Sequence, residues 1–444
     1  MNNKIGIVSL GCAKNLVNSE QMMYKINSAG FQATADTEDV AAVVVNTCAF
    51  IEAAKLEAIE TILELSELKS EGRIGKIIVA GCLAQRYKSE LMNEMPEIDA
   101  IIGVGSFDKI AGVIEETLQG GSDNKPMRFG NINAPVSETG RVLTTSPAWE
   151  YLKIAEGCDN HCAYCVIPDI RGQYRSRPVK NIVKEANALV KTGIRELILV
   201  AQDVTRYGLD LYGKSCLPEL LESLCKIERL KWIRLHYLYP DEITDELIDV
   251  VNENGKILKY LDIPIQHIND GILREMNRRG TSADIRALFK QLRERIPGVV
   301  IRTSLIAGLP GEGDKEFKEI CEFLEETRIE RAGVFVYSPE EGTPAASMER
   351  PDNDIAAERA GVLTELQSRI MDGFNQSRVG SVTTVLIERY EEGRYYGRSF
   401  AESPDIDGYI MVSGENIVPG SFAEVMITGV EDGELTGEAL IVDS

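Results

Sequence analysis

Three closely spaced cysteines are the residues of this sequence best suited to chemistry. Cys158, Cys162 and Cys165 have C-x3-C-x2-C spacing and directly follow an apolar run at 151–155. Three thiolates this close together can hold a four-iron cluster and leave one of its irons without a protein ligand. A catalytic metal site keeps an open position for substrate in the same way. The alternative is a structural zinc knuckle, but no fourth ligand stands at a normal zinc spacing. His161, inside the loop, is expected to face solvent or to support the ligands.

Three further cysteines each follow a predicted strand. Cys12, Cys48 and Cys82 come just after apolar runs in a region that alternates strand-like and helix-like patterns. The predicted strands are 4–8, 41–45, 76–80 and 99–102, and the predicted helices are 16–29 and 52–68, the latter with Leu56, Ile59 and Leu63 on one face. Parallel strands end at one edge of a sheet, and ligands bind there. The three cysteines are therefore predicted to converge as a second metal site. Three buried structural cysteines are the alternative.

A second βα region follows a Gly/Asn/Ser/Pro-rich segment at 120–140, which is predicted to be a surface loop or linker. The predicted strands are 151–155, 196–201, 232–236, 260–263, 299–307 and 333–337, and the predicted helices include 179–191, 217–226, 241–253, 283–295 and 315–326. Six repeats are fewer than the eight of a closed barrel, so we predict an open, partial barrel. Cys225 and Cys321 fall in helical patterns and are expected in the core.

Polar residues near the ends of these strands are candidates for ligand binding, because barrel enzymes place functional groups at the carboxyl ends of their strands. They are Gln202, Asp203, His236, Gln266, His267, Ser304, Gly308, Tyr337 and Ser338. Each is equally compatible with a capping or loop role. Together they are expected to line the mouth of the barrel above the first cluster.

The C-terminal region reads as a long helix followed by a small β-barrel. The helix is predicted at 355–378, and the strands at 383–388, 394–400, 408–412, 423–430 and 435–442. From Arg378 onward there are 13 acidic residues against four arginines and no lysine, so the net charge of this region is −9. A barrel that binds nucleic acid is expected to be basic or studded with aromatic residues.

Length and composition limit the remaining possibilities. A chain of 444 residues is expected to form two or three domains, predicted here as 1–145, 146–375 and 376–444. The net charge of −22 favours a basic protein as partner over bare RNA. No apolar run is long enough to span a membrane, and the N-terminal residues do not resemble a signal peptide. We therefore expect a cytoplasmic protein whose cysteines serve metals or catalysis.

Several segments resemble the methylthiotransferase branch of the radical S-adenosylmethionine enzymes. They are 9–15, 46–50, 81–86 and the loop 158–165, and the likeness extends over nearly the whole chain, with a terminal barrel similar to a TRAM domain. The stretches 151–160, 201–208 and 337–343 look like the members that modify a ribosomal protein of the small subunit. Ala13 stands where the branch often has proline, but this is not a ligand position.

The resemblance implies two [4Fe-4S] clusters. Cys158, Cys162 and Cys165 would hold the cluster that binds S-adenosylmethionine and generates a 5′-deoxyadenosyl radical, using an electron from a reductant such as flavodoxin or ferredoxin. Cys12, Cys48 and Cys82 would hold a second cluster that carries the sulfur. Of the strand-end candidates, Gln202, Ser304 and Gly308 are expected to contact S-adenosylmethionine because of their positions. Tyr164 is expected to lie near the adenine, unless it is a plain packing aromatic. No catalytic side chain is assigned, because a cofactor must supply the reactive species.

The expected reaction replaces a hydrogen on the β-carbon of an aspartate in a basic small-subunit ribosomal protein by a methylthio group. Two alternatives remain at this point. One is a tRNA adenosine methylthiotransferase, which shares the architecture and both cysteine sets. The acidic terminal barrel argues against it. The other is a non-enzymatic iron–sulfur electron carrier, which would need neither the barrel mouth nor S-adenosylmethionine.

Overall fold

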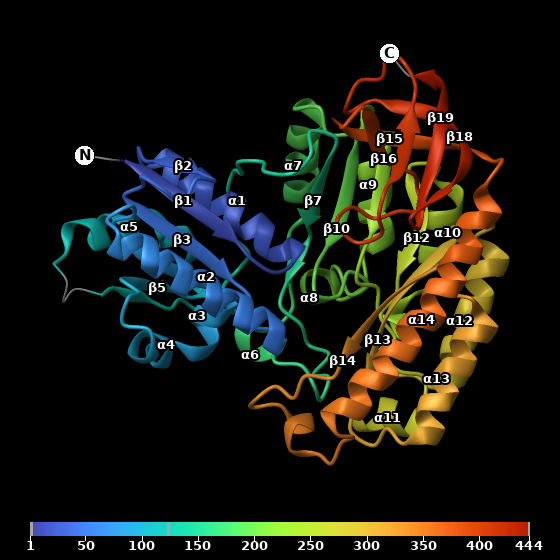
Figure 1. Cartoon of the computed structure of the whole chain (residues 1–444), viewed down its shortest axis with the longest axis horizontal. Coiled ribbons are helices and arrows are strands. Elements are labelled where there is room, and N and C mark those ends of the chain that lie inside the picture. The colour runs from blue at the N-terminus through green and yellow to red at the C-terminus, as the bar shows by residue number, and fades with distance from the viewer. Residues whose placement is uncertain (1–2, 122–124, 443–444) are drawn as a thin grey trace. The chain divides into compact units, whose positions relative to one another are not determined.

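The computed structural model describes residues 3–121 and 125–442, and the chain divides into two compact units. The first unit contains the chain up to residue 144 together with 155–177 and 338–346. The second contains 145–154, 178–337 and the chain from 347 onward. Figure 1 labels the helices and strands of both units. Among the described residues, no helix has both the length and the apolar character needed to cross a membrane.

A six-stranded parallel sheet organises the first unit, with strand order β2-β1-β3-β4-β5-β6. Its strands are β1 (Lys4–Ser9), β2 (Gln32–Thr34), β3 (Ala42–Thr47), β4 (Ile77–Gly81), β5 (Ala100–Ile102) and β6 (Met127–Arg128). The helices of this unit are α1 (Ala13–Ser28), α2 (Glu52–Ser70), α3 (Cys82–Tyr87), α4 (Ser89–Glu94), α5 (Ile110–Gln119) and α6 (Ile167–Arg171), with the 3₁₀ helix η1 (Val104–Lys109). A short hairpin, β8 (Ala155–Glu156) with β9 (Arg175–Ser176), completes it.

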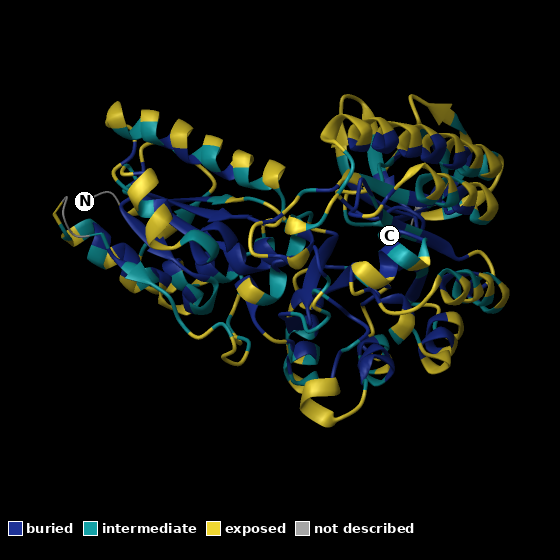
Figure 2. Ribbon diagram, turned by 90° about the horizontal axis from the view of Figure 1, so that it is seen from below, coloured by how far each residue is buried: buried dark blue, intermediate teal, exposed yellow. Residues whose placement is uncertain are grey.

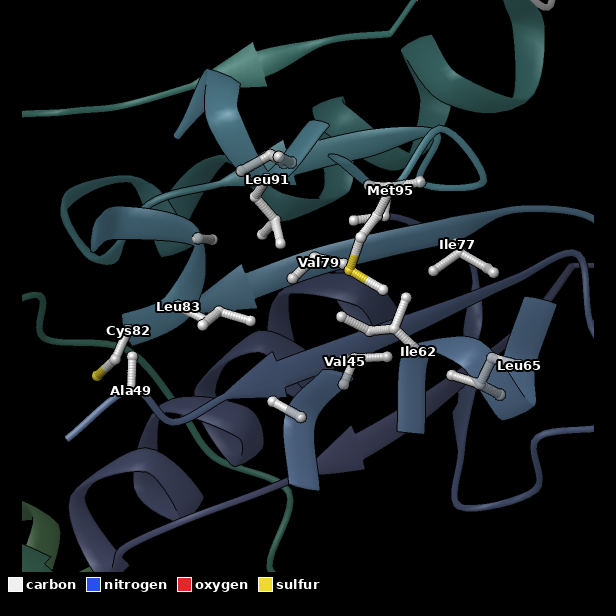
Figure 3. Packing of buried hydrophobic residues seen from close by; sticks show 14 of the residues in the cluster. Val45, Ala49, Ile62, Leu65, Ile77, Val79, Cys82, Leu83, Leu91 and Met95 are labelled. Carbon is white, nitrogen blue, oxygen red and sulfur yellow. The ribbon is translucent and has the colours of Figure 1, made fainter. Parts of the chain in front are cut away.

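Both faces of this sheet are covered, because its central strands carry buried apolar side chains on both sides. Successive residues of β3 point to opposite faces. Val43 and Val45 pack in one core with residues of α2, α3 and α6, whereas Val44 packs in another with residues of α1 and α5. Figure 3 shows Cys82 beside Ala49, at the end of the first core remote from Leu65. In Figure 2 the strands are dark blue and the outer faces of the helices yellow.

The sequence-based predictions fail at several points in the first unit. The apolar stripe of α2 is not its core face, because Leu56 and Leu63 are each 49% exposed. The buried side chains of α2 are instead Ala58, Ile62 and Leu65. The segment predicted as a surface loop or linker at 120–140 also contributes the two-residue strand β6 to the sheet, and its residues 122–124 lie outside the described residues. The strand predicted at 151–155 ends at Lys153 in the second unit, and Ala155 begins β8 in the first.

The second unit contains the predicted open sheet of six parallel strands, in the order β14-β13-β12-β11-β10-β7. The strands are β7 (Trp149–Lys153), β10 (Glu196–Val200), β11 (Trp232–Leu235), β12 (Ile257–Asp262), β13 (Val300–Ala307) and β14 (Arg331–Val336). The helices are α7 (Val179–Lys191), α8 (Leu209–Tyr212), α9 (Leu217–Cys225), α10 (Asp245–Glu253), α11 (Asp270–Glu275), α12 (Ser282–Arg295), α13 (Asp314–Thr327) and α14 (Asn353–Arg378). The prediction of a partial barrel is therefore confirmed (Figure 1).

A closed five-stranded barrel follows α14 within the same unit. Its strands are β15 (Val382–Glu391), β16 (Arg394–Arg398), β17 (Ile410–Ser413), β18 (Phe422–Glu431) and β19 (Glu434–Val442). Alternating side chains such as Val385, Ile387 and Val425 form its own core. Closure pairs every strand on both sides, so no strand edge remains open.

Buried charges join this small barrel to the larger sheet. Glu196 of β10 accepts from Arg234 of β11 (Nε to Oε1, 2.7 Å) and from Arg398 of β16 (Nη2 to Oε2, 2.7 Å). Arg398 also pairs with Glu388, whose other oxygen accepts from the indole of Trp149. The two arginines and Glu196 are fully buried, so every charge needs its partner.

The loop at 399–407 extends this junction along the larger sheet. Arg234 donates to the carbonyl of Phe400 (2.8 Å), and Ser403 Oγ lies 2.8 Å from His236 Nε2. Tyr260 donates to Asp407. The loop thus occupies polar groups of β11 and β12. His236, predicted to line the barrel mouth, is one of these groups, so its contact with Ser403 makes it part of the junction.

Candidate functional site

The first cysteine set lies at one edge of the six-stranded sheet. Cys12 precedes α1 directly after the β1 turn, Cys48 follows β3, and Cys82 begins α3 at the end of β4. All three are free thiols. Gly11 lies so close to Cys48 that a Cβ on Gly11 would be 2.6 Å from the Cys48 Cβ. The sheet topology therefore places these cysteines, which are far apart in the sequence, at the same edge of the sheet.

Asn15 braces the turns that carry these cysteines. Its buried amide donates to the carbonyls of Leu10 (2.7 Å) and Thr47 (3.1 Å), which precede Cys12 and Cys48 in the chain. A side chain that satisfies two turn carbonyls at once fixes the distance between the turns. No sequence pattern marks this role, because an asparagine near a helix start usually caps the helix.

Burial and neighbouring charges act in opposite directions on the thiols. Burial raises the pKa of Cys82, and burial together with the nearby sulfurs of Cys82 and Cys12 raises the pKa of Cys48 to about 11. Burial acts the same way on Cys12, but the charges of Lys14 and Arg171 outweigh it and lower the pKa of Cys12. A metal cluster would replace the protons of Cys48 and Cys82, because cysteine binds metals as the thiolate.

The second cysteine set lies on a loop closed at its neck. The hairpin β8–β9 pairs Glu156 with Arg175, and Cys158 N donates to Gly172 O (3.1 Å). Gly157, with a φ of +84°, lies so close to Gln173 that a Cβ would be 2.0 Å from its carbonyl oxygen. Within the loop, Cys165 N donates to Cys162 O (3.0 Å). The loop thus presents its cysteines from a fixed base.

Two other predictions concern side chains of this loop. His161, predicted either to face solvent or to support the ligands, is exposed and has a φ of +48°. Tyr164, predicted either to contact the cofactor or to pack, is only 9% exposed. Its burial is compatible with both roles.

Arg171 connects the two cysteine sets and was missed in the sequence. It ends α6, just past the loop, and only 2% of it is exposed. It donates to Glu156 Oε1 (2.8 Å), to Asn15 Oδ1 (2.9 Å) and to the sulfur of Cys82 (3.3 Å). Residues 82 and 171 are 89 positions apart, and no local pattern relates them.

Each cysteine set offers three thiols, which are the usual ligands of iron–sulfur clusters. Among residues 3–121 and 125–442, no three His, Cys, Asp or Glu side chains are arranged to hold one ion. In a four-iron cluster each thiolate binds a different iron, so the sulfurs stand apart. Two sets of three cysteines with buried surroundings are therefore chemically suited to two open clusters.

The remaining predicted contacts belong to the second unit. Gln202 follows β10 and is half-buried, Ser304 lies within β13, and Gly308 follows β13 with a φ of +81°. A Cβ on Gly308 would be 2.3 Å from the Cβ of Ala356 on α14, so close packing alone accounts for this glycine. Its amide donates to Glu312 Oε1 (3.0 Å).

The neighbouring strand-end residues make contacts of their own. Asp203 accepts from the amide and hydroxyl of Thr205 in its own turn. Cys225 and Cys321, expected in the core, are half-buried on α9 and α13.

Three family models match the chain. The "Radical SAM superfamily" model covers residues 152–324, the "TRAM domain" model covers 379–440, and the "Uncharacterized protein family UPF0004" model covers 4–103.

The chain has the fold of two solved cobalamin-binding proteins. A radical S-adenosylmethionine methyltransferase, TsrM from Kitasatospora setae, has a TM-score of 0.57 and 13% identity, with 94% of this chain and 80% of that one covered. The enzyme OxsB has a TM-score of 0.52 and 11% identity, with 83% and 56% covered. The chain is a radical S-adenosylmethionine enzyme, and that class implies S-adenosylmethionine and one [4Fe-4S] cluster.

Relatives that match over their full length show which family of radical S-adenosylmethionine enzymes the chain belongs to. The "Ribosomal protein uS12 methylthiotransferase RimO" of Caldanaerobacter subterraneus is 46% identical, with 98% of this chain and 99% of the relative covered. The protein of the same name from Lachnoclostridium phytofermentans is 47% identical, with 98% and 100% covered. This chain therefore belongs to the RimO family of methylthiotransferases. The family membership anticipated from the cysteine motifs is confirmed.

Proposed function

We propose that this enzyme inserts a methylthio group at the β-carbon of an aspartate in ribosomal protein uS12, a protein of the small subunit. The relatives named for that reaction match almost the entire chain at 44–47% identity. The observation that carries the proposal is the presence of both cysteine sets in one compact unit, linked through Arg171. Sulfur insertion requires a radical source and a sulfur source, and two open metal sites can supply them.

Cys158, Cys162 and Cys165 would hold the first [4Fe-4S] cluster, and Cys12, Cys48 and Cys82 a second one. When bound, the first cluster and S-adenosylmethionine supply a radical able to break an unactivated C–H bond, and the second cluster supplies the sulfur. The protein itself positions the cysteine ligands and keeps water away from them. Cys48 and Cys82 are 9% and 5% exposed, which keeps water from the sulfur-carrying site. Asn15 and Arg171 hold the turns that bear the ligands.

Tyr164, Gln202, Ser304 and Gly308 are proposed to contact S-adenosylmethionine. The position of Gln202 after its strand supports this assignment, and Tyr164 lies between two cysteines of the first set. We assign no catalytic acid or base. We further propose domain limits of 1–145, 146–375 and 376–444. A small reductant such as flavodoxin or ferredoxin would deliver electrons, and the enzyme would work in the cytoplasm, where its basic ribosomal substrate is made.

Mass spectrometry of the small ribosomal subunit tests this proposal. Protein uS12 from cells lacking the gene should lack the methylthio group, a loss of about 46 Da for replacement of one hydrogen by SCH₃. Expression of the intact chain should restore the mass, whereas Cys82→Ala should not. Cys225→Ala provides a matched control, because Cys225 is half-buried on α9 and belongs to neither cysteine set. It should restore the mass fully.

Two results would assign a different function. An unchanged uS12 mass, together with altered tRNA adenosines, would make the enzyme a tRNA methylthiotransferase. An iron-loaded protein that releases no 5′-deoxyadenosine from S-adenosylmethionine would point to an electron carrier. The proposal requires both an altered uS12 mass and 5′-deoxyadenosine release.

A further inference from the structure

Arg171 stands where the chain re-enters the hairpin below the first cysteine loop. Glu156 lies two residues before Cys158, and Arg171 lies six residues after Cys165. Their ion pair, with Nη1 and Oε1 2.8 Å apart, therefore spans the neck of the loop. The hydrogen bond from Cys158 N to Gly172 O closes the same neck. The guanidinium is thus held in place from the side of the first cysteine set.

The other end of the same guanidinium faces the second cysteine set. Its Nη2 donates to Asn15 Oδ1 (2.9 Å) and to the sulfur of Cys82 (3.3 Å). Asn15 in turn donates to the carbonyl just before Cys48. One buried side chain therefore contacts a sulfur of one set and the base of the other.

The charge balance around Arg171 has a direct electronic consequence. Its carboxylate partner is Glu156, so the pair is neutral before any cluster binds. A cluster held by three thiolates adds negative charge, and reduction adds one more electron. A cationic donor on a ligand sulfur stabilises the more negative, reduced state. Burial strengthens this effect, because water does not screen the interaction.

We propose that Arg171 is a positioning residue that fixes Cys82 relative to the first cysteine loop and raises the reduction potential of the second cluster. The proposal rests on the proposed function, since it requires a cluster at Cys12, Cys48 and Cys82. It makes the sulfur-carrying site easier to reduce than its three thiolates alone would allow. It also links any movement of the first cysteine loop to the environment of the Cys82 sulfur.

A redox titration of the second cluster alone tests the proposal. The parent is the full-length chain with Cys158→Ala, Cys162→Ala and Cys165→Ala, reconstituted anaerobically, so that about four irons remain per chain. In this parent, Arg171→Gln should raise the ratio of oxidised to reduced cluster at a fixed potential about tenfold, equal to about 59 mV for one electron. Arg171→Lys keeps the charge and should give a smaller shift of the same sign. Electron paramagnetic resonance during dithionite titration measures the ratio.

Arg141→Gln is the matched control. Arg141 is also a buried arginine with a buried glutamate partner, since its Nε donates to Glu20 Oε2 (3.0 Å) in the same unit. Its loss should destabilise the protein without changing the ratio. A change of less than threefold for Arg171→Gln would overturn the proposal, as would an equal change for Arg141→Gln. If Arg171→Gln does not retain iron, an unshifted Arg171→Lys overturns it instead.

The iron content separates this inference from the proposed function. A parent that binds no iron would overturn the second cluster itself, and the role of Arg171 with it. A parent with about four irons and a potential insensitive to Arg171 would overturn only the inference.

Discussion

At the scale of single residues, the buried carboxylate of Glu340 is the shared partner of two cations and one hydroxyl group. It is 2% exposed and accepts from Arg86 Nη1 (2.6 Å), with Lys55 Nζ at 3.2 Å and Ser338 Oγ at 2.7 Å. The segment around it, 338–346, comes from late in the sequence but packs in the first unit. Glu340 therefore anchors this segment beside the helix that begins at Cys82.

Glu340→Gln should lower the free energy of unfolding by about 3–5 kcal/mol, because it leaves two cations facing a neutral amide in a buried site. Limited proteolysis should also cut the segment 338–346 faster in the variant. Glu341→Gln is the neighbouring control. Its side chain is exposed, so both measurements should match the unmodified protein. Equal stability of the two variants would contradict the anchoring role.

Glu402 determines part of the acid stability of the second unit. Although burial alone would raise its pKa, the charges of Arg378 and Arg331 lower it to about 2. The depressed value means that Glu402 stabilises the fold above pH 4.5 and loses this effect as the pH falls towards 2. The contribution is on the order of 3 kcal/mol.

Urea unfolding between pH 7 and pH 2 measures that contribution. The stability of the intact chain should fall steeply below about pH 4.5. Glu402→Gln should be less stable at pH 7 and show a shallower fall. Glu358→Gln, on the exposed face of α14, should follow the intact chain throughout. Parallel curves for Glu402→Gln and the intact chain would refute the assignment.

At the scale of elements, the base of the first cysteine loop depends on Gly157. A side chain there would meet the Gln173 carbonyl at 2.0 Å, and the residue has a φ of +84°. Gly157→Ala should therefore open the neck of the loop and lower the iron retained per chain after reconstitution. Gly112→Ala, on α5 with nothing within 4 Å of the added Cβ, should retain all its iron and be slightly more stable. Full iron in Gly157→Ala would show that the neck is not required.

The elements were predictable where a pattern of several residues marks them. The apolar runs identified all five barrel strands and the long strands of both sheets. The missed strands β2, β6, β8 and β9 have two or three residues each, too short for any periodicity. The core face of α2 was predicted wrongly for another reason. Its buried residues are Ala58, Ile62 and Leu65, and not the more apolar row that begins at Leu56. Helical periodicity identifies an apolar face but not what covers it.

The residues of the candidate site also fall into two groups, those that the sequence could predict and those that it could not. Cysteine spacing and the ends of the strands identified all six proposed ligands, because both can be read directly from the order of residues in the chain. Arg171, Asn15 and Glu340 could not be found, because each acts through residues at least 30 positions away or through backbone carbonyls. Side chains that brace a site leave no spacing signature.

At the scale of the whole molecule, the C-terminal barrel completes the second unit. Arg398 joins Glu196 of the large sheet to Glu388 of the barrel, and all three are buried. Arg398→Met should lower the free energy of unfolding by about 3–5 kcal/mol, because buried Glu388 loses its cation and buried Glu196 keeps only Arg234. Arg394→Met removes an ion pair that is half-exposed, with Glu431, and should cost less than about 1 kcal/mol. Thermal unfolding distinguishes them, and a similar melting temperature for both would argue against a shared core.

This junction also affects the order of events during synthesis. Glu196 lies 202 residues before Arg398, its partner in the finished unit. At a translation rate of about 5–20 residues per second, roughly 10–40 s separate the two. During that interval Glu196 of the nascent sheet has Arg234 as a partner but still lacks Arg398. Chaperones that shield unfinished sheets would therefore act mainly before residue 407 has left the ribosome.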